Sequence, residues 1–165
     1  MPVRSVTPEP AAALLLAGLD FADAYQLVVG ETALDATAAA QRVFSRTPGW
    51  IASLLALRNR LGALIGLNGG GEAAFDRSLP PEKRRRIGLF PIVSEARDRV
   101  VMGFDDWHLD FRVVVDVLSL EADRQQVTTT TLVRTHNWVG RAYLALIMPF
   151  HRVIVRTMLA QAAKA

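Results

Sequence analysis

An alternation of apolar and polar side chains over residues 106–120 constrains the fold of this 165-residue chain more than any other feature. The apolar set occupies every second position and comprises Trp107, Leu109, Phe111, Val113, Val115 and Val117. The positions between them are mostly polar: Asp106, His108, Asp110, Arg112 and Asp116. Successive side chains of a strand point to opposite faces, so the pattern predicts a sheet with one buried and one solvent-exposed face. A strand of this length must also twist or curl.

Four further segments favour strands because they are rich in β-branched and aromatic residues and end at turn-forming residues. They are residues 20–29, 87–93, 99–105 and 127–136. From residue 87 onward the links between strands are short. Parallel strands need long crossovers, so we expect antiparallel neighbours.

A long amphipathic helix is predicted for residues 138–162, with Asn137 as its N-cap. Its apolar stripe consists of Tyr143, Ile147, Phe150, Ile154 and Met158. Pro149 lacks a backbone donor and predicts a kink. The apolar face of the sheet is the only large surface that can bury the stripe. Two shorter helices are predicted before the long strand, one capped by Asp35 and one starting at residues 47–48.

These elements predict one α+β domain, residues 1–165, with the long C-terminal helix packed across a curved antiparallel sheet. Hydrophobic residues make up 51% of the chain and charged residues 21%, so the chain can fill a core. The absence of cysteine excludes a disulfide scaffold, a thiolate metal site and a cysteine nucleophile. This composition fits a reducing compartment, and we expect a cytoplasmic location.

Two apolar stretches need to be distinguished from targeting or membrane segments. Residues 11–19 follow Pro8, Glu9 and Pro10, which stand where the hydrophobic helix of a signal peptide would begin. Residues 139–159 contain three arginines and a histidine, which are costly in the centre of a bilayer. We therefore expect neither a cleaved signal nor a transmembrane segment.

Several local motifs are similar to those of a bacterial family of unknown function. The motifs are residues 103–112 (GFDDWHLDFR), 128–134 (TTTTLVR), 136–143 (HNWVGRAY) and 149–152 (PFHR), together with Trp50, residues 57–59 (LRN) and residues 66–67 (GL). That family is usually grouped with the SRPBCC superfamily of START-like and birch-pollen-allergen-like proteins. The resemblance spans nearly the whole chain and implies the helix-grip fold, with a cavity between the sheet and the C-terminal helix. It implies no reaction, because the superfamily includes lipid and hormone binders, polyketide cyclases and aromatic-ring hydroxylase domains.

One group of polar residues is predicted on the long strand. His108, Asp110 and Arg112 are expected to share a face, with Arg134 and His136 on the neighbouring strand. An acid, a base and a cation on one surface can transfer a proton or bind an anion. The structural alternative is a solvent-exposed face with cross-strand ion pairs. We favour this alternative because the apolar face must point inward.

A second polar group lies where the last strand meets the long helix: His136, Asn137, Arg141, Tyr143, His151 and Arg152. Structural roles are favoured, since buried polar groups are paired and the kink at Pro149 frees a carbonyl. The functional alternative is that Arg141, Tyr143 or His151 lies at a cavity mouth and orients a carboxylate or carbonyl.

Other site classes have little support in the sequence. The histidines His108, His136 and His151 have no short ligand spacing, so we expect no metal site and no cofactor. The glycine cluster at residues 68–71 lacks the continuation of a phosphate loop. The basic run at residues 83–86 has no interleaved aromatic residue, and the formal net charge is only +3, so no nucleic-acid partner is expected.

Three functional hypotheses remain. The first is binding of a small hydrophobic or amphipathic ligand between the sheet and the C-terminal helix, although a solid core would use the same apolar residues. The candidate ligand-binding residues are Trp107, Phe111, Val113, Val115, Arg141, Tyr143, Ile147, Phe150 and His151. The second is a cyclase, dehydratase or isomerase acting on a carbonyl compound through His151, Tyr143 or Arg141. The third is a ligand-free homodimeric interaction module, with the aliphatic residues 14–19 as one candidate contact.

Overall fold

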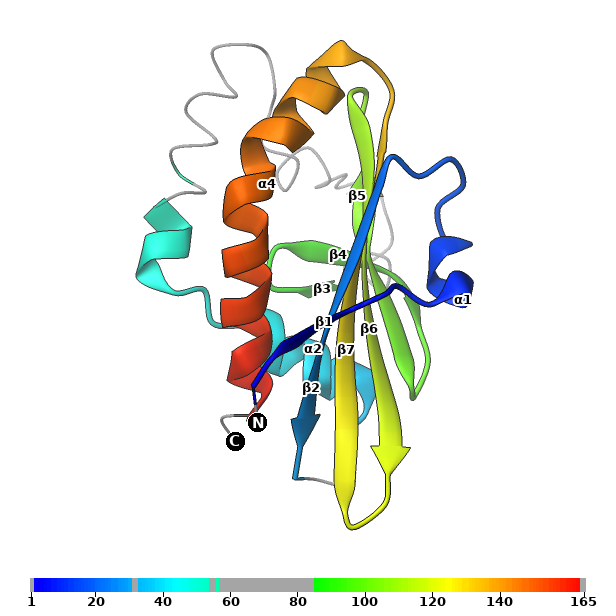
Figure 1. Ribbon diagram of the computed structural model, residues 1–165, viewed down its shortest axis with the longest axis vertical. Helices are drawn as coiled ribbons and strands as arrows, with labels where there is room; N and C mark the ends of the chain where they lie inside the picture. The colour runs from blue at the N-terminus through cyan, green and yellow to red at the C-terminus, as the bar shows by residue number, and fades with distance from the viewer. Residues whose placement is uncertain (1, 31–32, 54–55, 57–84, 164–165) are drawn as a thin grey trace.

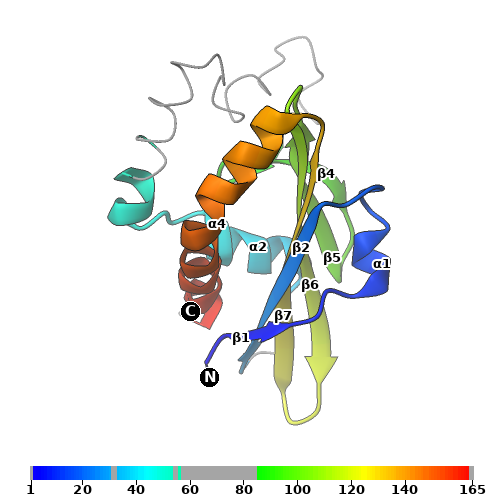
Figure 2. The same ribbon diagram turned by 45° about the horizontal axis from the view of Figure 1, so that its top comes forward.

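The computed structural model describes residues 2–30, 33–53, 56 and 85–163, which form one sheet with helices on both of its sides (Figures 1 and 2). In chain order the elements are β1 (Arg4–Val6), α1 (Pro10–Ala13), β2 (Phe21–Val29), α2 (Ala36–Phe44), β3 (Arg86–Ile87), β4 (Phe90–Glu95), β5 (Arg99–Asp105), β6 (Leu109–Leu120), β7 (Arg124–Thr135), α4 (Trp138–Leu159) and the 3-10 helix η2 (Ala160–Ala163). Within these residues the sheet has the order β1-β2-β7-β6-β5-β4-β3, and every neighbouring pair is antiparallel. The predicted α+β class and antiparallel sheet are confirmed.

Several predicted strand boundaries were wrong, and β7 starts at Arg124 rather than at residue 127. The segment 87–93 is split into β3 and β4 by a turn in which Gly88 has a left-handed φ of 57°. The long strand starts at Leu109 rather than at residue 106, because residues 106–108 form the turn that closes the β5–β6 hairpin. In that turn the Asp106 N–H donates to the carbonyl of Leu109 (3.0 Å), and the Asp106 carboxylate accepts from the N–H of Trp107 (2.7 Å).

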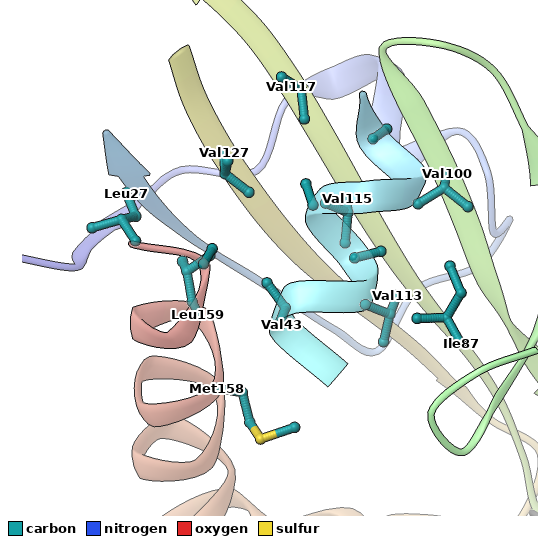
Figure 3. Packing of buried hydrophobic residues seen from close by; sticks show 14 of the residues in the cluster. Leu27, Val43, Ile87, Val100, Val113, Val115, Val117, Val127, Met158 and Leu159 are labelled. Carbon is teal, nitrogen blue, oxygen red and sulfur yellow. The ribbon is translucent and has the colours of Figure 1, made fainter. Parts of the chain in front are cut away.

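The main core lies on the sheet face that α2 and α4 cover. Asp35 caps α2 as predicted, since its carboxylate accepts from the N–H of Ala38 at 2.7 Å. Val43 of α2 belongs to the same core cluster as Val113 and Val115 of β6 (Figure 3). The C-terminal end of α4 contributes Met158 and Leu159 to the same cluster. The apolar face of the long strand therefore points inward, as its alternation predicts. The predicted second helix is described only in part: residues 49–53 are helical, and most of the rest lies outside the described residues.

The opposite sheet face is not wholly exposed, in contrast to the expectation from the sequence. Leu16, which follows α1, packs in a second cluster with Val101, Val114 and Leu132. Figure 2 shows α1 on the side of the sheet opposite α2 and α4. In the segment predicted as a possible dimer contact, Leu16 is thus buried within its own chain, whereas Leu14 is 85% exposed.

The start of α4 is fixed by contacts with the β5–β6 turn. The Asn137 side chain accepts from the N–H of Gly140 at 3.1 Å, which confirms the predicted N-cap, and also donates to the carbonyl of Trp107 at 3.0 Å. The helix runs back along the sheet and changes direction along its length (Figure 1), and Pro149 lies inside it. The kink predicted from Pro149 accounts for this change.

Burial increases along α4. Near its C-terminal end Met158 and Leu159 are buried. In its N-terminal half the inward-facing Tyr143 and Ile147 remain partly exposed. On the facing sheet Phe111 is likewise only half-buried. The two ends of the helix–sheet interface are therefore packed differently.

We predict that Gly140→Ala destabilises the domain. A Cβ built on Gly140 lies 2.0 Å from the carbonyl oxygen of His108, so the helix start or the turn must shift. Overpacking of this kind costs about 2 kcal/mol. Urea denaturation should show a lower midpoint for this variant. Gly30→Ala is the matched control, because its added Cβ meets nothing within 4 Å. Equal midpoints for both variants would contradict the described packing of α4 on the turn.

Candidate functional site

Four polar side chains of β2 and β7 lie together on the inward face of the sheet. Asp23 is paired in register with Thr131, and Tyr25 with Thr129. Alternation along β2 places Asp23 on the same face as Tyr25, which belongs to the main core cluster. His151 reaches this group from α4. We call these five residues the polar patch.

The polar patch is flanked by apolar side chains of the same sheet face. The cross-strand rows on its two sides are apolar and consist of Phe21, Val133 and Phe111 on one side and Leu27, Val127 and Val117 on the other. Within the patch the exposures of Thr129 (1%), Thr131 (2%) and Tyr25 (4%) are those of core residues. Polar groups buried to this degree need hydrogen-bond partners, which makes their arrangement informative.

His151 and Asp23 form the link between helix and sheet. The Nε2 atom of His151 lies 3.2 Å from Oδ1 of Asp23, and their side chains are only 12% and 17% exposed. A carboxylate accepts, so Nε2 carries the donated proton and Nδ1 is the second ring nitrogen. The edge of the imidazole also packs against the Phe21 ring, with centroids 5.8 Å apart. The histidine ring is therefore held in one orientation.

Two oxygen atoms of the polar patch have no hydrogen-bond partner among the described residues. They are Oδ2 of Asp23 and Oγ1 of Thr129, and both are buried. A buried polar atom without a partner costs roughly 1–3 kcal/mol, more for a charged group. A bound water molecule or another polar group would satisfy such atoms.

Arginines of α4 border the polar patch. The guanidinium carbon of Arg156 lies 5.4 Å from the centroid of the Tyr25 ring. Burial raises the pKa of the Tyr25 phenol, the charge of Asp23 raises it further, and Arg156 and Arg152 oppose this shift. Tyr25 thus remains a neutral hydroxyl beside two cations and one carboxylate.

The structure separates the nine predicted ligand-binding residues into three groups. Val113 and Val115 are fully buried in the core, where α2 packs. Phe111, Tyr143 and Ile147 are half-buried in the less packed half of the interface, and His151 belongs to the polar patch. The remaining three are on the outside: Trp107 (54% exposed), Phe150 (48% exposed) and Arg141.

The predicted group on the long strand does not form one site. His108 precedes β6 and is 1% exposed, with its ring 5.6 Å from that of Tyr143. Asp110 pairs with His136 at 2.8 Å, and Arg112 pairs with Asp105 at 2.6 Å. These are the ion pairs of a structural sheet face. A further pair on this face joins Arg99 to Asp116 at 2.5 Å, where burial raises the pKa of Asp116 and Arg99 opposes the shift.

Asp23 and Tyr25 were not predicted as site residues. The sequence does carry a signal for Asp23, because residues 21, 23, 25, 27 and 29 read Phe, Asp, Tyr, Leu and Val. A single carboxylate within an alternating apolar set is a charge placed on the buried face of a strand. The partnership with His151 could not be predicted, since it joins residues 128 positions apart.

The described residues contain no candidate metal site. In the part of the chain that the structure describes, no group of three or more His, Cys, Asp or Glu side chains is arranged to hold a metal ion.

The C-terminal helix is apolar enough to be compared with a transmembrane helix. Trp138–Ala163 is long and apolar enough to cross a membrane by length and composition alone, and only 11% of its most apolar window is buried. This segment nevertheless packs on the sheet through Met158 and Leu159 and carries the His151–Asp23 contact, as in a soluble-type sheet-and-helix domain.

The fold and the polar patch define an α+β domain with a long helix across an antiparallel sheet, a geometry compatible with the helix grip. The model of a family described as "Protein of unknown function (DUF2867)" matches residues 15–158, and the chain belongs to this family. Neither a search of curated proteins nor a search of solved structures found a match.

We predict that Tyr25 titrates late. The chain has two tyrosines, so the absorbance of tyrosinate can separate them. In folded protein one transition should lie above pH 10.0, the ordinary value, because burial and Asp23 disfavour the phenolate. The unfolded chain loses this proton first, so stability should fall as the pH rises above 10.0. Tyr143→Phe leaves Tyr25 as the only tyrosine of the chain and should keep the late transition; a transition at or below pH 10.0 in this variant would contradict the burial of Tyr25.

Proposed function

We propose that this chain is a cytoplasmic binding domain for a small amphipathic ligand, which lies between the sheet and the N-terminal half of α4. The observation that carries the proposal is the buried, incompletely paired polar patch at the border of a partly exposed apolar interface. An apolar site with a few convergent polar groups is the usual form of a small-molecule site.

The apolar part of the proposed site consists of aromatic side chains of the sheet and two side chains of α4. Phe111 contacts the rings of Phe90 (5.5 Å) and Phe104 (5.6 Å), which extend the aromatic surface across the sheet. Tyr143 and Ile147 are the α4 side chains that we assign to the same site. All five are half-buried rather than buried. A ligand that covered them would remove apolar surface from water, at about 25 cal/mol per Å².

Membership of the SRPBCC superfamily belongs to the same proposal. Two observations support this membership. One is the antiparallel sheet with a C-terminal helix packed across it, and the other is the pair of motifs at residues 103–112 and 136–143. In such a fold the ligand site lies between the helix and the sheet, where the polar patch is found. The fold alone does not indicate which ligand is bound, and the polar patch is therefore the main support for binding.

We predict that Ile147→Trp blocks binding without unfolding the domain. N-phenyl-1-naphthylamine, an uncharged dye that fluoresces in apolar surroundings, is a suitable probe. The larger side chain should occupy the ligand space and weaken dye binding about tenfold or more, with a melting temperature close to that of the wild type. Leu146→Trp is the control, because Leu146 is adjacent in sequence but 64% exposed.

Two outcomes would overturn the proposed function. One is the absence of dye binding to the wild-type protein. The other is a large loss of stability in Ile147→Trp, which would indicate a solid interface, since overpacking a filled core costs roughly 1–3 kcal/mol. If neither outcome is observed, native mass spectrometry of the purified protein would identify any ligand that co-purifies.

A second candidate function is acid–base catalysis on a carbonyl compound, which the His151–Asp23 contact favours. Nε2 of His151 donates to Asp23, so Nδ1 can accept a proton from the carbon next to a bound carbonyl. The ring can then deliver this proton to another carbon of the ligand, as an isomerase requires. Arg141, another predicted candidate, is exposed and lies outside the patch.

The catalytic candidate predicts deuterium exchange into 2-octanone in D₂O, followed by proton NMR. The α-hydrogens should exchange faster with the wild-type protein than in buffer, and His151→Gln should abolish the difference. Exchange at the buffer rate, or an unchanged rate in the variant, would exclude this function but would not contradict the proposed binding function.

A further inference from the structure

The most specific chemical requirement in the molecule is the unmet hydrogen-bonding capacity of the polar patch. Asp23 uses Oδ1 for His151, whereas its Oδ2 is buried without a partner among the described residues. Thr129 also has an unmet hydrogen-bonding atom. Its side chain is 1% exposed, and its Oγ1 has no partner among the described residues. We propose that these two atoms bind an uncharged hydroxyl group of the ligand. This inference rests on the proposed binding function and names the class of ligand.

A hydrogen-bond donor is required because Asp23 can only accept. Hydrogen bonds to ionised groups are stronger than those between neutral groups, by roughly a factor of two. A hydroxyl that donates to Oδ2 keeps its lone pairs and can accept from Thr129. Thr129 lies diagonally from Asp23 on the paired strand, one step from Thr131 along the inward face. An alcohol therefore satisfies both unmet atoms, whereas an ether or ester oxygen satisfies only Thr129.

An ammonium group also donates, but the surrounding charges oppose it. Arg152 and Arg156 both act on Tyr25, which lies beside Asp23 on the same face of β2. A ligand cation would meet the Arg156 guanidinium near the Tyr25 ring as well as the Asp23 carboxylate. The interior also disfavours burying a charged group more than a hydroxyl. The burial of a charge and the nearby guanidinium therefore select against an amine.

A carboxylate is excluded from the same position for the opposite reason. It has no hydrogen to donate to Oδ2 and would place a second negative charge against the Asp23 carboxylate. Arg156 could attract it, but the Arg156 guanidinium is placed over the Tyr25 ring, and its side chain is exposed. A carboxylate bound there would lie outside the polar patch.

Four probes with an unbranched octyl or octanoyl chain and different head groups test the inference. They are 1-octanol, octyl methyl ether, octylammonium and octanoate, measured by isothermal titration calorimetry on the full-length protein. We expect 1-octanol to bind about tenfold more tightly than each of the others, as one charge-assisted hydrogen bond predicts. Equal affinities, or preference for a charged head group, would overturn the inference while leaving the binding function intact. If none of the four probes binds, the proposed function fails together with it.

Matched variants locate the head group. Thr129→Val and Thr130→Val change neighbouring residues that are both 1% exposed, but Thr130 points to the opposite face of the sheet. Thr129→Val should weaken the binding of both 1-octanol and the ether, because the oxygen of each accepts from Thr129, and Thr130→Val should leave both affinities unchanged. Asp23→Leu should reduce the preference for 1-octanol over the ether to about one, since the acceptor is lost.

For Asp23→Leu the affinity ratio is compared within the variant, so a general change in stability does not alter its meaning. If Asp23→Leu does not fold, the threonine pair decides. Affinities for 1-octanol and the ether that are the same in Thr129→Val as in Thr130→Val would show that the head group lies elsewhere and would overturn the assignment to the polar patch.

Discussion

The antiparallel pairing of β6 with β7 is the constraint on which the rest of the structure depends. The two strands are in register from Leu109 with Thr135 to Leu120 with Arg124. Because side chains alternate, a slip of one residue would turn every apolar side chain of β6 away from the helices. β2 pairs with the other edge of β7 in a fixed register, which places Asp23 opposite Thr131 and Tyr25 opposite Thr129. The polar patch is thus a product of strand register rather than of any local motif.

Sequence alone predicted the parts of the fold that depend on local periodicity. The alternation of β6 gave the inward face, and Asn137 gave the start of α4. The turn at residues 106–108 was missed, because Trp107 continues the apolar pattern although Asp106 already bends the chain. The second cluster around Leu16 was missed for another reason. An apolar run near the N-terminus does not reveal which surface it covers, and the partners of Leu16 are more than eighty positions away.

The candidate site was predicted only in part, and the physical reason is the range of its contacts. His151 could be chosen from the sequence because it follows the predicted kink at Pro149 and belongs to the polar group near the start of the helix. Its significance depends on Asp23, which the pairing of β2 with β7 positions. Trp107 was chosen because it continues the apolar alternation, and Arg141 because it belongs to the same polar group as His151. Neither pattern gives the direction of the side chain, and both residues are exposed. The described geometry replaces them with Asp23, Tyr25 and Thr129 as the polar residues to examine.

The uneven packing of α4 has a consequence for the dynamics of the domain. Its C-terminal end is anchored by Met158 and Leu159, next to α2, and by the 3-10 helix that follows. Its N-terminal half is held mainly at the Asn137 cap and by the contacts near His151, with Pro149 between removing one backbone hydrogen bond. Local opening requires least free energy where few apolar contacts are lost. Within α4, amide hydrogens near Met158 should therefore exchange with solvent most slowly, and local opening of the segment between the Asn137 cap and Pro149 should require less free energy than opening of the C-terminal end.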